Sequence, residues 1–140
     1  MHPFFFYVQL GFEHISDLAG YDHILFLVAL CAVYRLAQWK SLLILVTAFT
    51  VGHSLTLALT AFGLLTVRSE IIEFLIPATI FLTAIFNVVN YEDTISRETL
   101  PRRYLAALFF GFIHGMGFSN YFRALLIDES AILLPLLGFN

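Results

Sequence analysis

The sequence predicts an all-α fold, a polytopic integral membrane bundle with four main spans and a short C-terminal hydrophobic fragment. Of its 140 residues, 60% are apolar and only 12% are charged, whereas about a quarter of a soluble domain is charged. The mean hydropathy is +0.89. The apolar residues form blocks near the roughly 20 residues that cross a bilayer, and most blocks lack the polar stripe of a soluble helix. We therefore expect residues 1–140 to form one transmembrane helical domain in a lipid bilayer.

The four predicted spans differ in continuity. The first, residues 4–36, is interrupted by polar residues and by Gly20, which can break or kink a helix. The other three cover residues 41–67, 71–89 and 104–122. The C-terminal fragment, residues 131–140, is ten residues long and covers only about half of a bilayer. We expect it to begin a further helix in a chain that stops early.

Basic residues gather in two of the connections. Five of the seven Lys and Arg residues lie within residues 35–40 and 91–103, whereas Arg68 and Arg123 lie at the other end of an up-and-down bundle. Short loops rich in Lys and Arg face the cytoplasm. We therefore expect a multi-pass protein of the cell (inner) membrane with its N-terminus outside. No basic patch suggests a nucleic acid partner.

Three histidines fall at nearly the same calculated depth. His23 lies thirteen residues before Leu36, His53 twelve after Ser41, and His114 ten after Tyr104. Continuous helices would place them roughly 20, 18 and 15 Å from the cytoplasmic edge. Ionisable residues at such depth face a bundle interior or an aqueous cavity. We therefore expect these three side chains to converge near mid-membrane.

The first span carries two further polar pairs. His14 and Asp17 are three residues apart and share a helix face, and Asp22 and His23 follow Gly20. In a continuous helix, nine residues turn by about 900°, so His14 and His23 would point in nearly opposite directions. A break at Gly20 would let both pairs turn toward the bundle axis.

The other spans each have one distinctive face. Thr50 and Ser54 lie on the same broad arc as His53. In the third span, Glu73 shares a side with residues 77, 80, 84 and 87, about 24 Å above Val89 and therefore nearer the outer surface. In the fourth, Gly111 and Gly115 lie beside His114, where small residues allow another backbone to approach closely.

These residue types are those that bind transition metals. Imidazole suits Zn, Cu, Fe and Ni, and carboxylates compensate the charge of a divalent ion. The candidate metal ligands are His14, Asp17, Asp22, His23, His53 and His114, with Ser54, Glu73 and Thr50 as supporting polar residues. A structural alternative is that each histidine hydrogen-bonds to a Ser, a Thr or a carbonyl and holds helices together.

Three sequence blocks carry a family resemblance. They are GYDHILFL at residues 20–27, with His14 ahead of it, FTVGHSLTL at residues 49–57, and GFIHGMGF at residues 111–118. In this order they resemble the HupE/UreJ family of hydrogenase and urease accessory membrane proteins. Glu73 falls where that family carries an acid in its third span. The resemblance implies delivery of nickel or another divalent metal to metalloenzyme maturation. With the imidazole chemistry above, the expected ion is Ni, with Zn, Co, Cu and Fe as alternatives. Family members usually continue beyond residues 136–140 into at least one more helix.

Two functions from different classes follow from these residues. In a permease or metal-delivery protein, His14 and Asp17 would capture the ion, the other four candidate ligands would bind it at mid-depth, and Glu73 would lie near the path. In an intramembrane zinc metallohydrolase, three histidines would hold Zn²⁺ and an activated water. Asp22 or Glu73 would then be the general base, and Ser54 would contact substrate.

A metal-free membrane scaffold is a third hypothesis. Four spans are few for a self-contained transporter, which favours a homo-oligomer.

Overall fold

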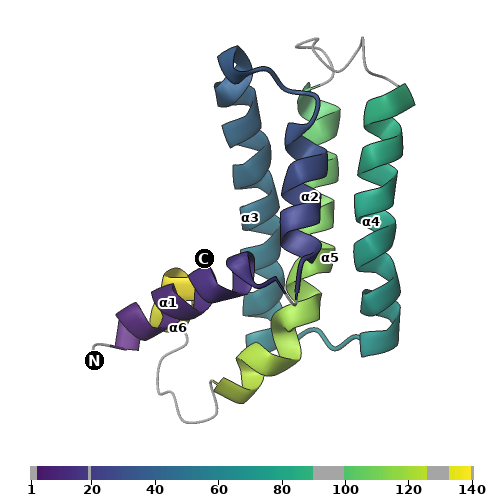
Figure 1. Cartoon of the computed structure of the whole chain (residues 1–140). Coiled ribbons are helices and arrows are strands. Elements are labelled where there is room, and N and C mark those ends of the chain that lie inside the picture. Colours follow the sequence, from purple (N-terminus) through teal and green to yellow (C-terminus); the bar gives the residue numbers. More distant parts are fainter. Residues whose placement is uncertain (1–2, 19, 90–99, 126–132, 140) are drawn as a thin grey trace.

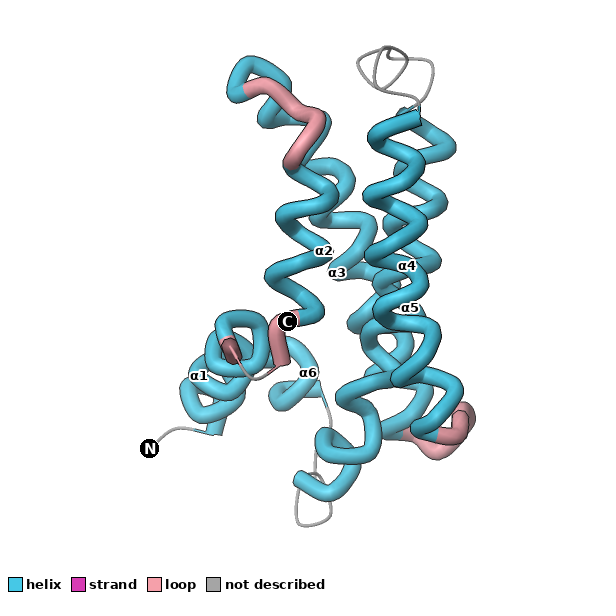
Figure 2. Tube along the Cα trace, turned by 45° about the vertical axis from the view of Figure 1, so that its right-hand side comes forward, coloured by secondary structure: helices cyan, strands magenta, loops and turns pink. Residues whose placement is uncertain are grey.

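The computed structural model describes residues 3–18, 20–89, 100–125 and 133–139, and the regular structure in these ranges is helical (Figure 1). The helices, in chain order, are α1 (Pro3–Ser16), α2 (Asp22–Cys31), the 3₁₀ turn η1 (Leu36–Gln38), α3 (Trp39–Ala61), α4 (Ser69–Val89), α5 (Leu100–Leu125) and α6 (Leu133–Phe139). Helices α2, α3, α4 and α5 run alongside one another, and α1 crosses them at a steep angle (Figures 1 and 2).

Three of these helices are long and apolar enough to cross a membrane, namely Leu36–Ala61, Ser69–Val89 and Pro101–Leu125. They correspond to the second, third and fourth predicted spans. The first predicted span is instead two shorter helices, α1 with 14 residues and α2 with 10. The chain leaves the helical conformation between Ser16 and Asp22, around Gly20. The structure therefore adopts the break that the sequence left open, and the count of four continuous spans is not confirmed.

The two ends of the bundle match the predicted up-and-down order. The connection between α2 and α3 lies at the same end as the C-terminus of α4 and the N-terminus of α5, and the connection between α3 and α4 lies at the opposite end (Figure 1). The first and third connections therefore share a side. Residues 91–99 of the third connection lie outside the described residues.

Helices α3 and α5 form the closest pair in the fold because glycine lines their contact. A Cβ added at Gly52 would collide with the carbonyl oxygen of Leu108, and one at Gly111 would collide with that of Phe49. A Cβ at Gly115 would lie 2.6 Å from the carbonyl oxygen of His53. Such small-residue contacts let transmembrane helices approach to backbone contact. The expectation that small residues of the last span admit another backbone is confirmed.

A hydroxyl adds a polar contact at this interface. The Thr56 hydroxyl lies 2.8 Å from the carbonyl oxygen of Phe112 on α5 and 3.0 Å from that of Gly52 on its own helix. The side chain of Thr56 is fully buried. Interhelical hydrogen bonds of this kind supply specificity where lipid offers no hydrophobic driving force.

The C-terminal fragment packs against the first helix. Gly11 of α1 lies against the Phe139 backbone, and a Cβ at Gly138 would be 2.9 Å from the carbonyl oxygen of Phe4. Buried Tyr7, Phe122 and Phe139 form an apolar cluster with Leu57 at this point. The fragment is therefore a seven-residue helix, α6, laid along α1 (Figure 2). Residues 131–132 and 140 of the predicted fragment lie outside the described part of the chain.

A polar contact joins three helices at the other end of the bundle. The Asn87 side-chain amide donates to the Ala29 carbonyl oxygen at 2.6 Å, and Arg103 donates to the Asn87 side-chain oxygen at 3.3 Å. The Arg103 guanidinium also lies 5.9 Å from the Tyr34 ring centre. Asn87 is thus an interhelical link between α2, α4 and α5.

The glycine contact predicts a difference between two identical substitutions on α5. Gly111→Ala places a methyl group against the Phe49 backbone, whereas Gly117→Ala meets the flexible end of Ile76 at 2.9 Å. Replacing Gly by Ala stabilises either helix position by about 1 kcal/mol through helix propensity. Overpacking costs about 1–3 kcal/mol, and it applies at Gly111, where the backbone of α3 would have to move. We expect Gly111→Ala to lower the unfolding midpoint in detergent and Gly117→Ala to leave it nearly unchanged. Equal midpoints in the two variants would contradict the close contact.

Candidate metal centre

The break between α1 and α2 brings two histidines of the predicted first span together. His14 lies in the last turn of α1, and His23 lies in the first turn of α2. Their ring centroids are 4.6 Å apart. A continuous helix would have separated the two side chains, so the interruption at Gly20 creates this pair.

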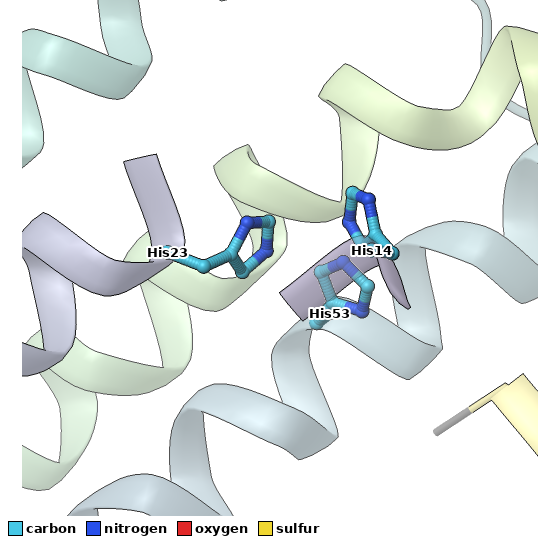
Figure 3. A group of neighbouring side chains, drawn as sticks. All are labelled: His14, His23 and His53. Carbon is cyan, nitrogen blue, oxygen red and sulfur yellow. The ribbon is translucent and has the colours of Figure 1, made fainter. Parts of the chain in front are cut away.

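His53 of α3 completes a cluster of three, which we call the histidine trio (His14, His23 and His53). Its ring centroid is 6.1 Å from that of His14 and 5.6 Å from that of His23. One nitrogen from each ring lies within 4.8 Å of the others. Figure 3 shows the three rings grouped around a common space, each reaching it from a different helix.

The trio has the donor set and nearly the spacing of a metal site. Two imidazoles on one tetrahedral ion, with metal–nitrogen distances of about 2.0–2.1 Å, have nitrogens roughly 3.4 Å and ring centroids roughly 5 Å apart. The trio nitrogens, all within 4.8 Å of one another, would have to approach by about an ångström. Rotation of the side chains about χ1 and χ2 supplies movements of this size.

The hydrogen-bonding state of the rings supports the same fit. The Nε2 atoms of His14 and His23 are buried and have no hydrogen-bond partner among the described residues. A buried polar atom without a partner destabilises a fold by about 1–3 kcal/mol. An ion held by these nitrogens would remove that penalty.

Aromatic side chains enclose the trio. Phe118 of α5 lies 4.1 Å from the ring centroid of His14, and Phe139 of α6 lies 5.3 Å from it. Phe49 lies 6.2 Å from His53 and 6.1 Å from His23. Apolar walls restrict water around the rings, and such a shell tunes a bound metal.

His114 does not belong to the trio. The sequence analysis expected His23, His53 and His114 to converge, whereas the trio contains His14 in place of His114. The Nε2 atom of His114 lies 3.0 Å from the Thr79 hydroxyl oxygen of α4, and its ring centroid is 5.6 Å from that of His23. His14 takes the expected place because the broken first span turns it inward. His114 therefore lies next to the trio, beside His23.

A cavity of about 860 Å³ is lined by three of these histidines and by the acids. The predicted site residues that line it are His14, Asp17, Asp22, His23, Glu73 and His114. On α4, Pro77, Ile80 and Ala84 also line it, which confirms the predicted side of the third span. Proline has no N–H, so Pro77 removes the helical donor to the Glu73 carbonyl. The cavity thus brings carboxylate side chains beside the imidazoles.

The acids occupy different parts of this space. Asp17 is exposed in the break after α1, and its charge acts on His14. Asp22 begins α2, where a carboxylate is stabilised by the N-terminal end of the helix dipole. Glu73 is exposed one turn into α4 and faces the cavity near its end at the α3–α4 connection, where Val67 and Ser69 also line it.

Two predicted supporting residues lie elsewhere. The Thr50 hydroxyl donates to the Val46 carbonyl oxygen at 3.0 Å, and the Ser54 hydroxyl donates to that of Thr50 at 2.7 Å. Neither side chain lines the cavity. Ser and Thr hydroxyls in helices commonly donate to the carbonyl one turn back. The position of Thr50 and Ser54 on the same arc as His53 therefore does not make them part of the site.

Family membership is decided by comparison with known proteins. A family model described as HupE / UreJ protein matches residues 1–140. The chain belongs to the HupE/UreJ family. No curated protein and no solved structure matches the sequence. HupE/UreJ membership and three apolar helices of membrane-spanning length fit a membrane protein with an accessory role in metal handling.

In this HupE/UreJ protein the sequence-based hypothesis missed Thr79, Phe118 and Phe139. Thr79 lies ten residues before Val89, just as His114 lies ten residues after Tyr104. The depth calculation applied to the histidines would therefore have paired Thr79 with His114. The aromatic residues carry no comparable signal, because phenylalanine is frequent throughout the chain.

The surroundings of His14 predict how it titrates. This residue lies in α1, outside the three helices of spanning length. Burial, followed by the nearby His23 and His53, lowers the pKa of His14 from 6.5 to about 3, while Asp17 acts to raise it. We expect the His14 ring to stay neutral at pH 5 in the metal-free protein, as ¹⁵N NMR of histidine-labelled protein would show. Asp17→Asn should lower the pKa further. Half-protonation of His14 near pH 6.5 would contradict the buried geometry.

Proposed function

We propose that this HupE/UreJ protein is a membrane permease or delivery protein for nickel or another divalent transition metal, with an intramembrane site of histidines and acids. One observation carries the proposal: the ligand atoms of His14, His23 and His53 lie within 4.8 Å of one another. Two of these residues line a cavity that also contains three carboxylates. The metal ion is the cargo of this protein.

The positions of the side chains suggest an order of contact. Asp17 and His14 would capture the ion where the broken first span meets the cavity, and Glu73 would attract it near the α3–α4 end. The trio would then hold it with Asp22 beside His23. His114 lies one ring further along, 5.6 Å from His23. Several moderate sites in series allow an ion to enter and leave, whereas one closed cage would trap it.

The donor set restricts the cargo to a class of ions. Imidazole nitrogen suits Ni, Zn, Co, Cu and Fe better than Mg or Ca, which prefer oxygen ligands. Family membership favours nickel among these. A homo-oligomer is part of the proposal, because the three helices of spanning length in the described part of the chain are few for a self-contained transport path.

Removal of one imidazole tests the metal site. Purified wild-type protein should bind about one Ni²⁺ per chain, and His53→Ala should bind it at least about 100-fold more weakly, since even partners of metal ligands contribute 10–100-fold. Titration calorimetry and metal analysis give both quantities. Thr47→Val is the matched control, because this exposed α3 hydroxyl donates to the Leu43 carbonyl of its own helix. Equal affinities for wild type and His53→Ala would contradict the proposal.

The zinc metallohydrolase is the second candidate, because three histidines with an adjacent cavity also suit a metal-bound water. Asp22 or Glu73, which line that cavity, would act as the base. Reconstitution into vesicles separates the two functions. Passage of Ni²⁺ into vesicles, abolished by His53→Ala, supports transport. Tightly held Zn²⁺ that resists chelators, with no passage of ions, supports the enzyme.

The orientation in the membrane is also part of the proposal. We place the α2–α3 connection in the cytoplasm and the N-terminus outside in the inner membrane, because residues 35–40 and 91–103 hold five of the seven basic residues. The cavity end lined by Val67 and Ser69 then faces outward, which suits uptake.

Cysteine labelling tests this orientation. Cys31 is the only cysteine in the sequence, so Cys31→Ser gives a background for Gln38→Cys or Thr66→Cys. In intact cells, an impermeant maleimide should label the Thr66→Cys protein and leave the Gln38→Cys protein unlabelled until the membrane is permeabilised. The reverse pattern would invert the proposed orientation.

A further inference from the structure

The Thr79 hydroxyl lies between two possible hydrogen-bond partners. Its oxygen is 2.7 Å from the Ile76 carbonyl oxygen of its own helix and 3.0 Å from Nε2 of His114 on α5. Thr79 and His114 are both buried. A hydroxyl has one hydrogen and two lone pairs, so the two contacts cannot both be donated by Thr79.

The carbonyl decides which way the hydrogen points. A carbonyl oxygen only accepts, so at 2.7 Å from Ile76 the Thr79 oxygen must donate its hydrogen there or face an unfavourable oxygen–oxygen contact. The contact with His114 must then be donated by the ring. His114 is therefore in the tautomer with hydrogen on Nε2, and its Nδ1 atom carries the bare lone pair.

The bare nitrogen is the ring atom of His114 that is available to a ligand. Nδ1 of His114 is buried and has no hydrogen-bond partner among the described residues. The neighbouring rings within 6 Å are Phe26, Phe49 and His23, and of these only His23 has polar atoms. The 5.6 Å between the His23 and His114 centroids is close to the roughly 5 Å of two imidazoles on one ion.

We propose that Thr79 is a positioning residue that fixes the tautomer of His114 and so presents Nδ1 as the ligand of a second metal position, which shares His23 with the trio. This inference rests on the proposed metal-handling function. Metal-bound histidines usually donate their other ring N–H to an acceptor that sets the tautomer, and Thr79 is that acceptor here. An ion would pass from the trio to His114 while His23 keeps contact with it.

Three variants of α4 separate this role from packing. Thr79→Val keeps the shape and removes the acceptor, whereas Thr79→Ser keeps the acceptor and removes a methyl group. Thr83→Val is the control on the same helix, because the Thr83 hydroxyl donates to the Thr79 carbonyl at 2.8 Å and makes no hydrogen bond with a histidine of the described chain. A packing role would be disturbed by Thr79→Ser, whereas a tautomer role would survive it.

The first measurement uses no metal. ¹⁵N NMR of histidine-labelled protein at about pH 8, where imidazoles are neutral, reports the tautomer of each ring, and loss of one signal set in His114→Gln assigns His114. Wild type, Thr79→Ser and Thr83→Val should show hydrogen on Nε2, and Thr79→Val should show a mixture or hydrogen on Nδ1. Hydrogen on Nδ1 in the wild type, or an unchanged tautomer in Thr79→Val, would overturn the inference.

The second measurement adds Co²⁺, whose absorption spectrum reports coordination. Binding that depends on His114 should weaken by about 10-fold in Thr79→Val, by analogy with other partners of metal ligands, and should be retained in Thr79→Ser. If the wild type binds no metal while the tautomer result holds, the proposed function fails and Thr79 merely orders His114. If the wild type binds metal and Thr79→Val binds it equally well, the second position fails and the trio stands.

Discussion

The candidate site depends on the backbone contact between α3 and α5. Gly52 and Gly111 let each helix fit against a carbonyl of the other, and Gly115 lies against the backbone of His53 itself. His53 and His114 are held by these two helices, so the separation of the helices sets the separation of the rings. A side chain at any of the three glycines would move both histidines relative to His23. Small residues here therefore serve the site as well as the packing.

The interruption of the first span is the second requirement. Backbone outside helical hydrogen bonding is tolerated in a membrane protein only where protein or a water-filled cavity surrounds it. Here the break lies between α1 and α2, and Asp17, Gly20 and Asp22 from it line the cavity. The break turns His14 toward His23. The α1–α6 contact, built on Gly11 and Gly138, then keeps α1 in this crossed position, with Phe139 over the ring of His14.

The sequence predicted the helical class, marked Gly20 as a candidate break and placed Glu73, Pro77, Ile80 and Ala84 on one side of α4, because periodicity and breakers are local properties. It also predicted that histidines from different helices lie at one level, which needs only the rise per residue. It did not predict that His14, rather than His114, would lie with His23 and His53 in the trio, because this depends on the angle at which α1 leaves the break. It also did not predict that α6 packs against α1, because this packing depends on contacts between residues far apart in the chain. Both are tertiary features that no single segment encodes.

The two hypotheses for the histidines, helix packing and metal binding, meet in His114. Its Nε2 joins α5 to α4 through Thr79, as the packing hypothesis expects, yet its Nδ1 is buried without a partner in the described chain. The Nε2 atoms of His14 and His23 are in the same state. A metal-free scaffold would be more stable with apolar side chains at these positions. Histidines with such nitrogens beside one another and beside carboxylates are what the proposed metal-handling function requires.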